Sequence, residues 1–544
     1  MRGGAVLAGL ALAALLSPAD VARAEAAGEA VSAELLARIT PFMQAVAESA
    51  GDDRDIAAFY RANGYRAIWT DGSAAGRRRL EALMSAIARA EDHALPRDRF
   101  EGAMREAGLD HITTERQLGR AEVALSRIFL DYAQAVHSGI LTPGDIDPAI
   151  ERKPPRLDRR KLLDEIATAD DPARLIRSLA PRTPEYARLM RAKRELEAKL
   201  AAGGWGPKVP AGSLKPGDRG AAVVALRNRL MAMGYMERSL SAVYDGRLQQ
   251  AVQAFQIDSG LGADGVAGRA TIAEINKDIE DRLPAIYVAM ERERWLNIDR
   301  GARHIWVNIP DFVVRIIDNG KVTFETRSVV GKDSADRRTP EFSDEMEYIE
   351  INPNWNVPRS IAMKEYLPSI IASGGAAARH LQLVDGRGNV VNRAAVDYAQ
   401  YTPANFPFDL RQPPGNGNAL GRVKFMFPNP HNIYLHDTPA KSLFERDRRD
   451  FSHGCIRLHK PFEFAYAILA RQVADPVSFF QERLESGRLQ RVDLEQHIPV
   501  HIVYRTAYTS AKGKVIFRDD VYGRDAKIFA ALRQAGVRLP QPGS

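Results

Sequence analysis

The stretch that decides how this sequence folds runs Tyr434-Leu435-His436-Asp437-Thr438-Pro439 and, after a polar loop, Ser452-His453-Gly454-Cys455-Ile456-Arg457. It holds the only cysteine of the 544-residue chain, and four of the eleven histidines lie between positions 431 and 459. A thiol reacts as its thiolate, so it needs a nearby base or positive charge to lower a pKa of about 8.5. The histidines around Cys455 therefore indicate nucleophilic cysteine chemistry.

His436 is the candidate base for this thiol. It ends an apolar strand and precedes a turn, so its imidazole can face a substrate at the end of the strand. Gly454 permits a tight backbone path beside Cys455, and amides next to a nucleophile are candidate donors to the oxyanion of an acyl-transfer intermediate. In an extended segment Arg457 faces the same side as Cys455, two residues before it, so Arg457 is a candidate for holding a substrate carboxylate.

Two other interpretations of the cluster stay open. A buried cysteine among core or surface histidines would be purely structural. A zinc site could use His436, His453 and Cys455, but a fourth ligand is not evident and the His-x-Cys spacing is unusual for zinc. We expect no metal and no cofactor.

The sequence around this stretch has the pattern of a β-rich domain. Alternating or β-branched runs at 304–309, 312–317, 321–330 and 346–352 lie between turns such as Asp318-Asn319-Gly320, a hairpin signal. Strands are expected again at 421–427, 433–436, 500–506 and 515–518. The mixed stretch at about 362–414 is interpreted as an insertion that caps the domain. We therefore predict a β-rich domain over 301–500 and a C-terminal strand and helix segment over 501–544.

The preceding residues are helical in pattern. Apolar residues three and four apart predict a helical scaffold domain over 25–205. After a linker rich in glycine and proline, three short helical segments predict a compact module over 213–280, followed by a helical return to the scaffold over 281–300. The expected fold class is thus multidomain: a helical scaffold, a small three-helix module and a β-rich domain with a capping insertion.

The first residues resemble a cleavable export signal. Arg2 precedes an uncharged run rich in Ala and Leu, and Ala22-Arg23-Ala24 has the small residues that a signal peptidase reads, so we expect a signal over 1–24 cut near Ala24. A retained anchor is the alternative, although the run is shorter than the roughly 20 residues of a membrane span. We expect no stable span after cleavage. The net charge is +7, but the sequence has no dense run of Lys and Arg with interleaved aromatic residues, so we do not expect nucleic-acid binding.

At His436 and at Ser452–Arg457 the sequence resembles the L,D-transpeptidase catalytic domain, the YkuD-like family, whose motif is a histidine, a loop and Ser/Thr-His-Gly-Cys. Arg338-Thr339-Pro340, the run from Asn352 to Pro358 and the run from Gly421 to Phe425 are similar to its large, multidomain YcbB-like branch. The three-helix module resembles the peptidoglycan-binding-like family in Asp264, Gly265, Gly268 and Thr271; a spacer that has lost binding is the alternative.

This resemblance implies a role for each residue of the site. Cys455 would be the nucleophile and His436 the base, with the backbone carbonyl of Asp437, not its carboxylate, orienting the imidazole. The amides of Gly454 and Cys455 would form the oxyanion hole. The substrate site would be lined or organised by Tyr434, Trp355, His453 and Arg457, while Ser452 and His453 shape the loop.

The function implied is that of a periplasmic L,D-transpeptidase. It would form peptidoglycan cross-links through a thioester between Cys455 and a stem tetrapeptide, release D-Ala and transfer the acyl group to an amine. Carbapenem-type β-lactams are expected to acylate the same thiol. An L,D-carboxypeptidase-type hydrolase and a non-catalytic peptidoglycan-binding scaffold are the alternatives. The acceptor stays open between a second stem, an outer-membrane protein and a free D-amino acid.

Overall fold

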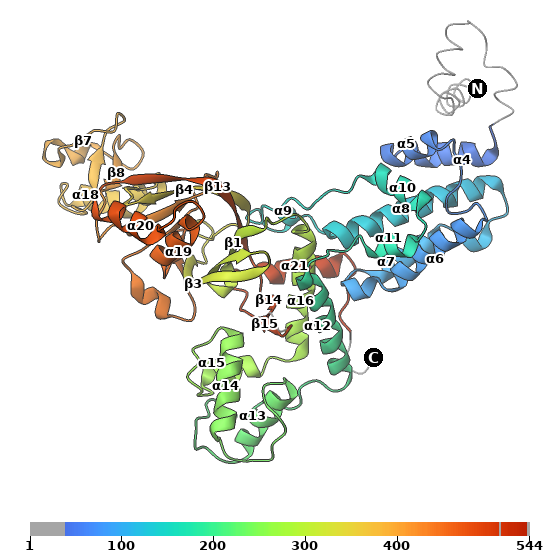
Figure 1. The fold of residues 1–544 in the computed structure, drawn as a ribbon, viewed down its shortest axis with the longest axis horizontal. Coiled ribbons are helices and arrows are strands. Elements are labelled where there is room, and N and C mark those ends of the chain that lie inside the picture. The colour runs from blue at the N-terminus through green and yellow to red at the C-terminus, as the bar shows by residue number, and fades with distance from the viewer. Residues whose placement is uncertain (1–38, 511–512, 541–544) are drawn as a thin grey trace, which may run out of the picture.

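The structure, a computed structural model, describes residues 39–510 and 513–540. The expected export signal at 1–24 lies outside the described residues, as do the first residues of the expected scaffold domain. A helical domain lies at one end of the molecule and a β-rich domain at the other, and a three-helix module is attached to the segment between them (Figure 1). This is the arrangement of parts expected from the sequence.

The N-terminal helices pack around α8 (Glu115–Ser138). This helix begins in a capping box, in which Thr114 and Gln117 each accept a hydrogen bond from the other's backbone N–H. The aromatic residues Phe59, Tyr60 and Trp69 are buried in the surrounding core. The other helices of this domain are α4 (Pro41–Ala50), α5 (Arg54–Ala62), α6 (Ala74–Ala88), α7 (Arg97–Glu106), α10 (Arg159–Thr168) and α11 (Pro172–Arg177), while the short α9 (Pro143–Ile146) packs through Ile146 on a second core, described next.

A second core, the junction core, joins the two ends of the molecule. It is built from α12 (Pro184–Ala201), α16 (Ile279–Trp295) and α21 (Arg524–Gln534), beside the hairpin of β14 (Ala507–Thr509) and β15 (Val515–Phe517). Every residue of α16 from Ile286 to Trp295 is buried, four charged residues included. Those charges are paired: Arg294 with Glu291, Glu293 with Arg300 and Arg505, and Arg292 with Glu341 and Asp525. Such pairing is what allows charges to be buried.

The three-helix module consists of α13 (Ala221–Ala232), α14 (Gly246–Ser259) and α15 (Arg269–Ile275) around its own core. Gln256 of α14 fixes the turn after that helix. Its side-chain oxygen accepts from Gly265 N–H at 2.9 Å and its amide donates to Asp264 Oδ1 at 2.9 Å. The Asp264-Gly265 pair of the sequence motif therefore has a structural role in closing the module.

The β-rich domain is built on a nine-stranded sheet in the order β11-β3-β12-β10-β9-β4-β13-β1-β2, and β2 also pairs with β3, so that the sheet closes on itself. Helices α19 (Pro461–Leu469) and α20 (Pro476–Glu485) contribute Phe464 and Phe480 to its core. The strands are β1 (Arg303–Asn308), β2 (Val313–Asp318), β3 (Lys321–Gly331), β4 (Ser343–Ile351), β9 (Val423–Met426), β10 (Leu435–His436), β11 (Asp450–Ser452), β12 (Ile456–Leu458) and β13 (Gln490–Val503).

Strand β13 differs from the expectation, because it begins ten residues before position 500 and crosses the predicted domain boundary there. Its first half has only Val492 and Leu494 facing the core, between exposed polar residues, and so lacks a continuous apolar run. The segment after it does not stand apart, since Ala507, Ile528 and Leu532 belong to the junction core.

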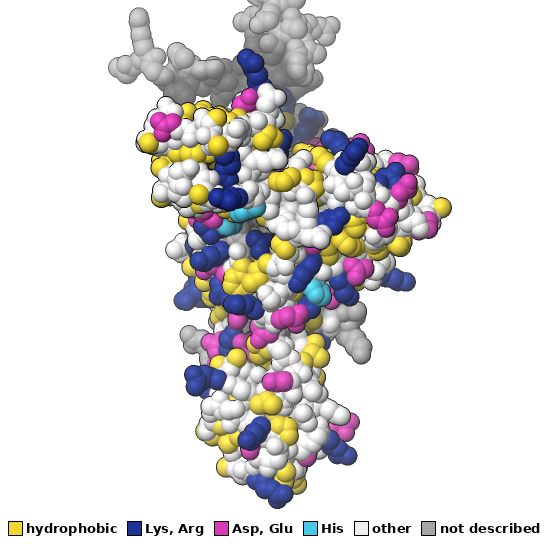
Figure 2. All heavy atoms as spheres, turned by 90° about the vertical axis from the view of Figure 1, so that its left-hand side faces the viewer, with side chains coloured by type: hydrophobic (Ala, Val, Ile, Leu, Met, Phe, Trp, Pro, Cys, Tyr) yellow, Lys and Arg dark blue, Asp and Glu magenta, His cyan; other side chains and the backbone are white. Residues whose placement is uncertain are grey.

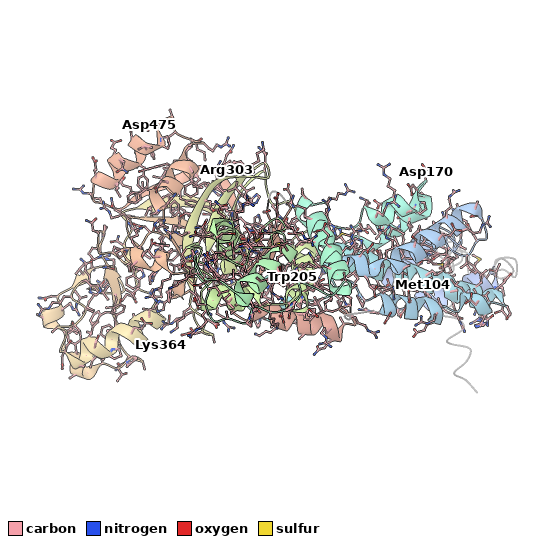
Figure 3. All side chains as sticks on the ribbon, turned by 90° about the horizontal axis from the view of Figure 1, so that it is seen from below. Met104, Asp170, Trp205, Arg303, Lys364 and Asp475 are labelled. Carbon is pink, nitrogen blue, oxygen red and sulfur yellow. The ribbon has the colours of Figure 1, made fainter. Side chains whose placement is uncertain are left out.

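The capping insertion, called the cap below, has its own sheet and core. The sheet has the order β5-β8-β6-β7, with β5 (Trp355–Asn356), β6 (Gln382–Val384), β7 (Val390–Val391) and β8 (Asp409–Gln412), beside α17 (Arg359–Ile361), the π-helical turn η4 (Ala362–Tyr366) and α18 (Leu367–Ala372). The cap begins earlier than position 362 because Trp355 pairs with Gln412. Lys364 of the cap and Met104 of the helical domain lie in opposite halves of the molecule (Figure 3).

The surface carries no strongly basic face in the view of Figure 2. The face in Figure 2 carries basic and acidic side chains in mixture and shows no single-sign patch. Among the helices of 39–510 and 513–540, none combines the length and the apolar character that crossing a bilayer requires.

Candidate active site

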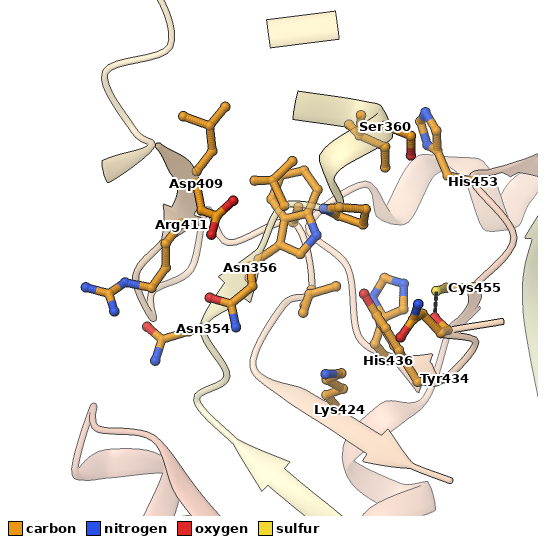
Figure 4. A pocket seen from close by; sticks show the side chains of 18 of the residues that line it. Asn354, Asn356, Ser360, Asp409, Arg411, Lys424, Tyr434, His436, His453 and Cys455 are labelled. Carbon is orange, nitrogen blue, oxygen red and sulfur yellow. Dashed lines mark hydrogen bonds between the residues drawn. The ribbon is translucent and has the colours of Figure 1, made fainter. Parts of the chain in front are cut away.

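A cavity of about 1050 Å³ lies between the sheet and the cap. Seven of the nine predicted site residues line it; the other two, Asp437 and Gly454, are not among the lining residues. In Figure 4 the side chains of Tyr434, His436 and Cys455 lie together on one side, with Lys424 near them, and those of Asn354, Asn356, Asp409 and Arg411 face them across the cavity. His453 and Ser360 lie at a third edge.

Strand pairing places the charged residues of the sheet side next to one another. His436 is the register partner of Arg457 in the parallel pair β10–β12 and of Lys424 in the antiparallel pair β10–β9. Side chains of directly paired residues share a face of the sheet. The imidazole therefore lies between two cations at the edge of the cavity.

His436 is held in one tautomer by the backbone. Its Nδ1 is hydrogen-bonded to the carbonyl oxygen of Asp437, which can only accept, so Nδ1 carries the proton and Nε2 keeps its lone pair. Burial, and after it the charge of Arg457, lowers the pKa of His436 to about 3. The imidazole is consequently neutral near pH 7 and able to accept a proton.

The carboxylate of Asp437 serves another purpose. Its Oδ2 accepts from Arg422 N–H at 2.9 Å and its Oδ1 from Lys441 Nζ at 2.6 Å, so both oxygens are engaged away from the imidazole. A Cβ on Gly421 would lie 2.2 Å from Asp437 Oδ2, and only glycine permits this close packing. The carboxylate thus fixes the start of β9.

Asp437→Asn tests this division of roles. The variant keeps the backbone carbonyl at His436 and one oxygen for Arg422 N–H, but loses the charge that pairs with Lys441. We expect the rate of acyl transfer to stay within about threefold of wild type and the free energy of unfolding to fall by about 1–2 kcal/mol. Steady-state kinetics and denaturant unfolding measure the two effects. A loss of 100-fold in rate would instead assign the carboxylate to the reaction.

The loop from Ser452 to Cys455 leaves one amide free beside the nucleophile. Gly454 has φ +115°, a conformation that favours glycine. Ser452 Oγ accepts from Gly454 N–H at 3.1 Å and donates to the Cys455 carbonyl at 2.6 Å. Of the two amides expected in the oxyanion hole, that of Gly454 is therefore engaged by Ser452, while that of Cys455 has no hydrogen-bond partner among the described residues.

The thiol of Cys455 is protonated in this arrangement. Sγ donates to the Asn432 carbonyl at 3.5 Å, and within the described part of the chain no hydrogen bond joins it to His436. Burial raises the pKa of the Cys455 thiol, while hydrogen bonding to Tyr434 and the charges of Lys424 and Arg457 act in the opposite direction. Catalytic hydrogen bonds often form only when substrate is bound, so this geometry agrees with a resting site.

Arg457 is an unpaired cation at the cavity wall. Its Nε is buried without a hydrogen-bond partner, and its guanidinium forms no ion pair with any residue that the structure describes. By contrast, Lys424 Nζ lies 3.5 Å from Glu350 and 4.3 Å above the ring of Tyr434. Arg457 is half-buried, and a partly desolvated cation without a partner is stabilised when an anionic ligand joins it, so Arg457 is suited to a carboxylate.

The cap is tied to the residue two before the nucleophile. Glu365 Oε1 lies 2.7 Å from His453 Nε2 and 2.7 Å from Arg337 Nη2. His453 therefore faces the cap and not the thiol. Trp355 packs edge-on against Tyr366 of the cap, with ring centroids 6.1 Å apart. Glu365 and Arg337 had no signal in the sequence, whereas Lys424 lies within the motif from Gly421 to Phe425.

The geometry does not favour the zinc interpretation. His436 is turned to the Asp437 carbonyl and His453 to Glu365, so the two imidazoles do not converge on Cys455. Within residues 39–510 and 513–540, no group of three or more His, Cys, Asp or Glu side chains is arranged to hold a metal ion.

Fold and site together define a multidomain protein whose β-rich domain carries a lone thiol near a neutral imidazole. Family models describe its parts: residues 54–192 match a scaffold domain, residues 219–275 a "Putative peptidoglycan binding domain", and residues 302–478 the L,D-transpeptidase catalytic domain, YkuD. The β-rich part of this chain thus matches the L,D-transpeptidase catalytic domain, YkuD, over residues 302–478. The multidomain fold class expected from the sequence is confirmed.

Two known proteins resemble parts of the chain. A "Putative L,D-transpeptidase" of Haemophilus influenzae is 30% identical over 300 residues, which are 55% of this chain and 59% of that protein. The match thus spans about three fifths of the relative's length. The crystal structure of an L,D-transpeptidase from Xylanimonas cellulosilytica (residues 123–326) matches at 14% identity with a TM-score of 0.16; the match covers 55% of this chain and 98% of that chain.

Proposed function

We propose that this protein is a periplasmic L,D-transpeptidase that forms peptidoglycan cross-links through a thioester on Cys455. One observation carries the proposal. In a domain of the L,D-transpeptidase family, the thiol, a neutral imidazole, a free amide and an unpaired arginine converge on one cavity. Each of these groups has a task in acyl transfer from a peptide that ends in a carboxylate.

The first half of the reaction is acylation. As Sγ of Cys455 attacks the carbonyl that precedes the terminal D-Ala of a stem tetrapeptide, its proton passes to Nε2 of His436. The Cys455 amide donates to the oxygen on which negative charge develops. The C–N bond then breaks, His436 gives the proton to the leaving amine, and D-Ala departs with a thioester left on Cys455.

The second half transfers the acyl group. An acceptor amine attacks the thioester carbonyl, a C–N bond forms, and the C–S bond breaks. His436 takes the proton that the amine loses, and the thiol is restored. The cap favours transfer over hydrolysis, because it walls the cavity and shields the thioester from bulk water. The amine of a second stem is the acceptor in this proposal.

Arg457 is the substrate anchor in this scheme. Its guanidinium is unpaired and shares a strand register with His436, so a terminal carboxylate bound there brings the preceding carbonyl toward Cys455. Tyr434 and Trp355 supply apolar walls for the peptide. Carbapenem-type β-lactams also carry a carboxylate next to a reactive carbonyl, and we propose that they acylate the same thiol.

The family matches of the three-helix module and of the catalytic domain support a location outside the cytoplasm. A match to a peptidoglycan-binding family and a catalytic domain of a wall-modifying family agree with a site of action outside the cytoplasm. The export signal expected at 1–24 would deliver the chain to the periplasm, with cleavage near Ala24. The three-helix module would then hold the enzyme on its polymeric substrate.

Product analysis tests the proposal. Purified protein is incubated with tetrapeptide stems, and the products are identified by mass spectrometry. We expect release of D-Ala and formation of cross-linked dimer. Free tripeptide without dimer would identify a hydrolase. Absence of any product, together with absence of a carbapenem adduct on the intact protein, would point to a non-catalytic scaffold.

A further inference from the structure

Thr339 lies directly behind the nucleophile and is fully buried. Its hydroxyl accepts from Gly331 N–H at 2.9 Å and donates to the Gly454 carbonyl oxygen at 2.7 Å. An amide N–H can only donate, so the single proton of the hydroxyl goes to Gly454. Thr339 therefore holds one end of the peptide unit that joins Gly454 to Cys455.

Holding this carbonyl also sets the direction of the amide. The described chain has no cis peptide bonds, and in a planar trans peptide the carbonyl oxygen and the N–H point in opposite directions. With the Gly454 oxygen fixed on Thr339 inside the domain, the N–H of Cys455 points away from Thr339. This is the amide that has no hydrogen-bond partner among the residues described.

We propose that Thr339 is a positioning residue, which aims the Cys455 amide at the developing oxyanion. The inference deepens the proposed function, on which it rests only for the statement that Cys455 performs acyl transfer. Thr339 touches neither substrate nor sulfur in this scheme. It acts through the Gly454 carbonyl alone, and Ser452 holds the next peptide unit by its bond to the Cys455 carbonyl.

Thr339 is itself rigidly held. A Cβ on Gly331 would lie 1.9 Å from the Arg337 carbonyl and 2.7 Å from Thr339 N, so β3 approaches the threonine as closely as glycine allows. On the other side Arg524 Nη2 donates to the Thr339 carbonyl at 3.0 Å. Because the backbone of Thr339 is held on both sides, its hydroxyl is presented to Gly454 in a fixed position.

The same segment is connected to the helical domain. Glu341 N–H donates to the Ala149 carbonyl at 2.8 Å, and Glu151 N–H donates to the Glu341 carbonyl at 2.8 Å. The carboxylate of Glu341 pairs with Arg292 of α16 and with Arg524 of α21. The Cys455 amide is thus held by Thr339, and the segment of Thr339 is in turn bonded to the residues that connect the scaffold to the catalytic domain.

The test compares two reagents on Thr339→Val, which keeps the shape of the side chain and removes the hydroxyl. With p-nitrophenyl acetate, a bond forms between Sγ and the acetyl carbon, nitrophenolate leaves, and an oxyanion forms on the way. With iodoacetamide, Sγ displaces iodide and no oxyanion forms. We expect acetylation to slow by about tenfold to 100-fold, and alkylation to stay within about twofold of wild type.

Two further variants keep the test decisive if Thr339→Val does not fold. Thr339→Ser retains the hydroxyl and should acetylate at nearly the wild-type rate, whereas Thr339→Ala should show the defect. Equal acetylation by all variants, or a parallel loss of acetylation and alkylation, would overturn the proposal. Because neither reagent is a peptide, wild-type protein that acetylates normally but does not convert stem peptides would refute the proposed function and leave this inference intact.

Discussion

Cys455→Ala is expected to lower the rate of D-Ala release from a stem tetrapeptide by about 10⁴-fold or more and to prevent any covalent adduct. Cys455 is the only cysteine, so no other thiol can replace it. The side chain is half-buried at the margin of the domain core, and alanine removes a single atom, so the fold should persist. Intact-mass measurement after incubation with substrate or carbapenem detects the adduct directly.

Cys455→Ser is the matched control for this variant. It preserves the shape of the site but replaces the thiol by a hydroxyl, which is a far weaker nucleophile without a strong base. We expect it to bind stem peptides as the wild type does and to form no adduct. Cross-linking by either variant at more than about a hundredth of the wild-type rate would remove Cys455 from the mechanism.

His436→Gln is expected to lower the rate of acylation by about 10²-fold to 10⁴-fold. Glutamine can still donate to the Asp437 carbonyl, so the loop geometry is preserved while the proton acceptor is lost. Asp437→Asn, which leaves the imidazole in place, serves as the control for local disturbance. Single-turnover acylation separates this effect from the transfer step.

The pH dependence provides the second measurement for His436. Its pKa of about 3 keeps the imidazole neutral as pH rises above that value, and the thiol stays protonated because its own pKa is raised. Wild-type acylation should therefore be nearly flat from about pH 5 to 8, since base and thiol both keep their forms. In His436→Gln only the thiolate reacts, so the residual rate should rise with pH. A wild-type midpoint between about pH 6 and 7 would contradict a buried neutral imidazole.

Periodicity and local motifs were sufficient to predict much of the fold. Runs such as 321–330 and 346–352 correspond to β3 and β4 within a few residues, because buried strands need continuous or alternating apolar residues. The run from Tyr434 to Arg457 was sufficient to place His436 and Cys455 at one cavity, since β10 and β12 are adjacent. The boundaries were less predictable, as the start of the cap at Trp355 shows.

The remaining parts of the site depend on contacts between distant segments. Thr339 lies 115 positions before Gly454, and Glu365 lies 88 positions before His453. Thr339 lies in a run that resembles the family, but that run does not indicate a contact with Gly454, and Glu365 in its short helical turn has no local signal of its contact with His453. The register of β9 against β10, which brings Lys424 beside His436, is likewise set by the closed sheet and not by either strand alone.

The junction core affects the order in which the chain can fold. It combines Ala94 and Ile150 with Ile528 and Leu532, so it needs residues from both halves of the polypeptide. During synthesis the N-terminal part of a chain emerges first, and domains generally fold as units in that order. The helices around α8 have their own core and can therefore form early. Until α21 has emerged, however, Arg292 lacks its partner Asp525. A polypeptide that ends before Arg524 would therefore leave the apolar side chains of the junction core exposed and Arg292 without Asp525. Proteases and chaperones could then bind this surface.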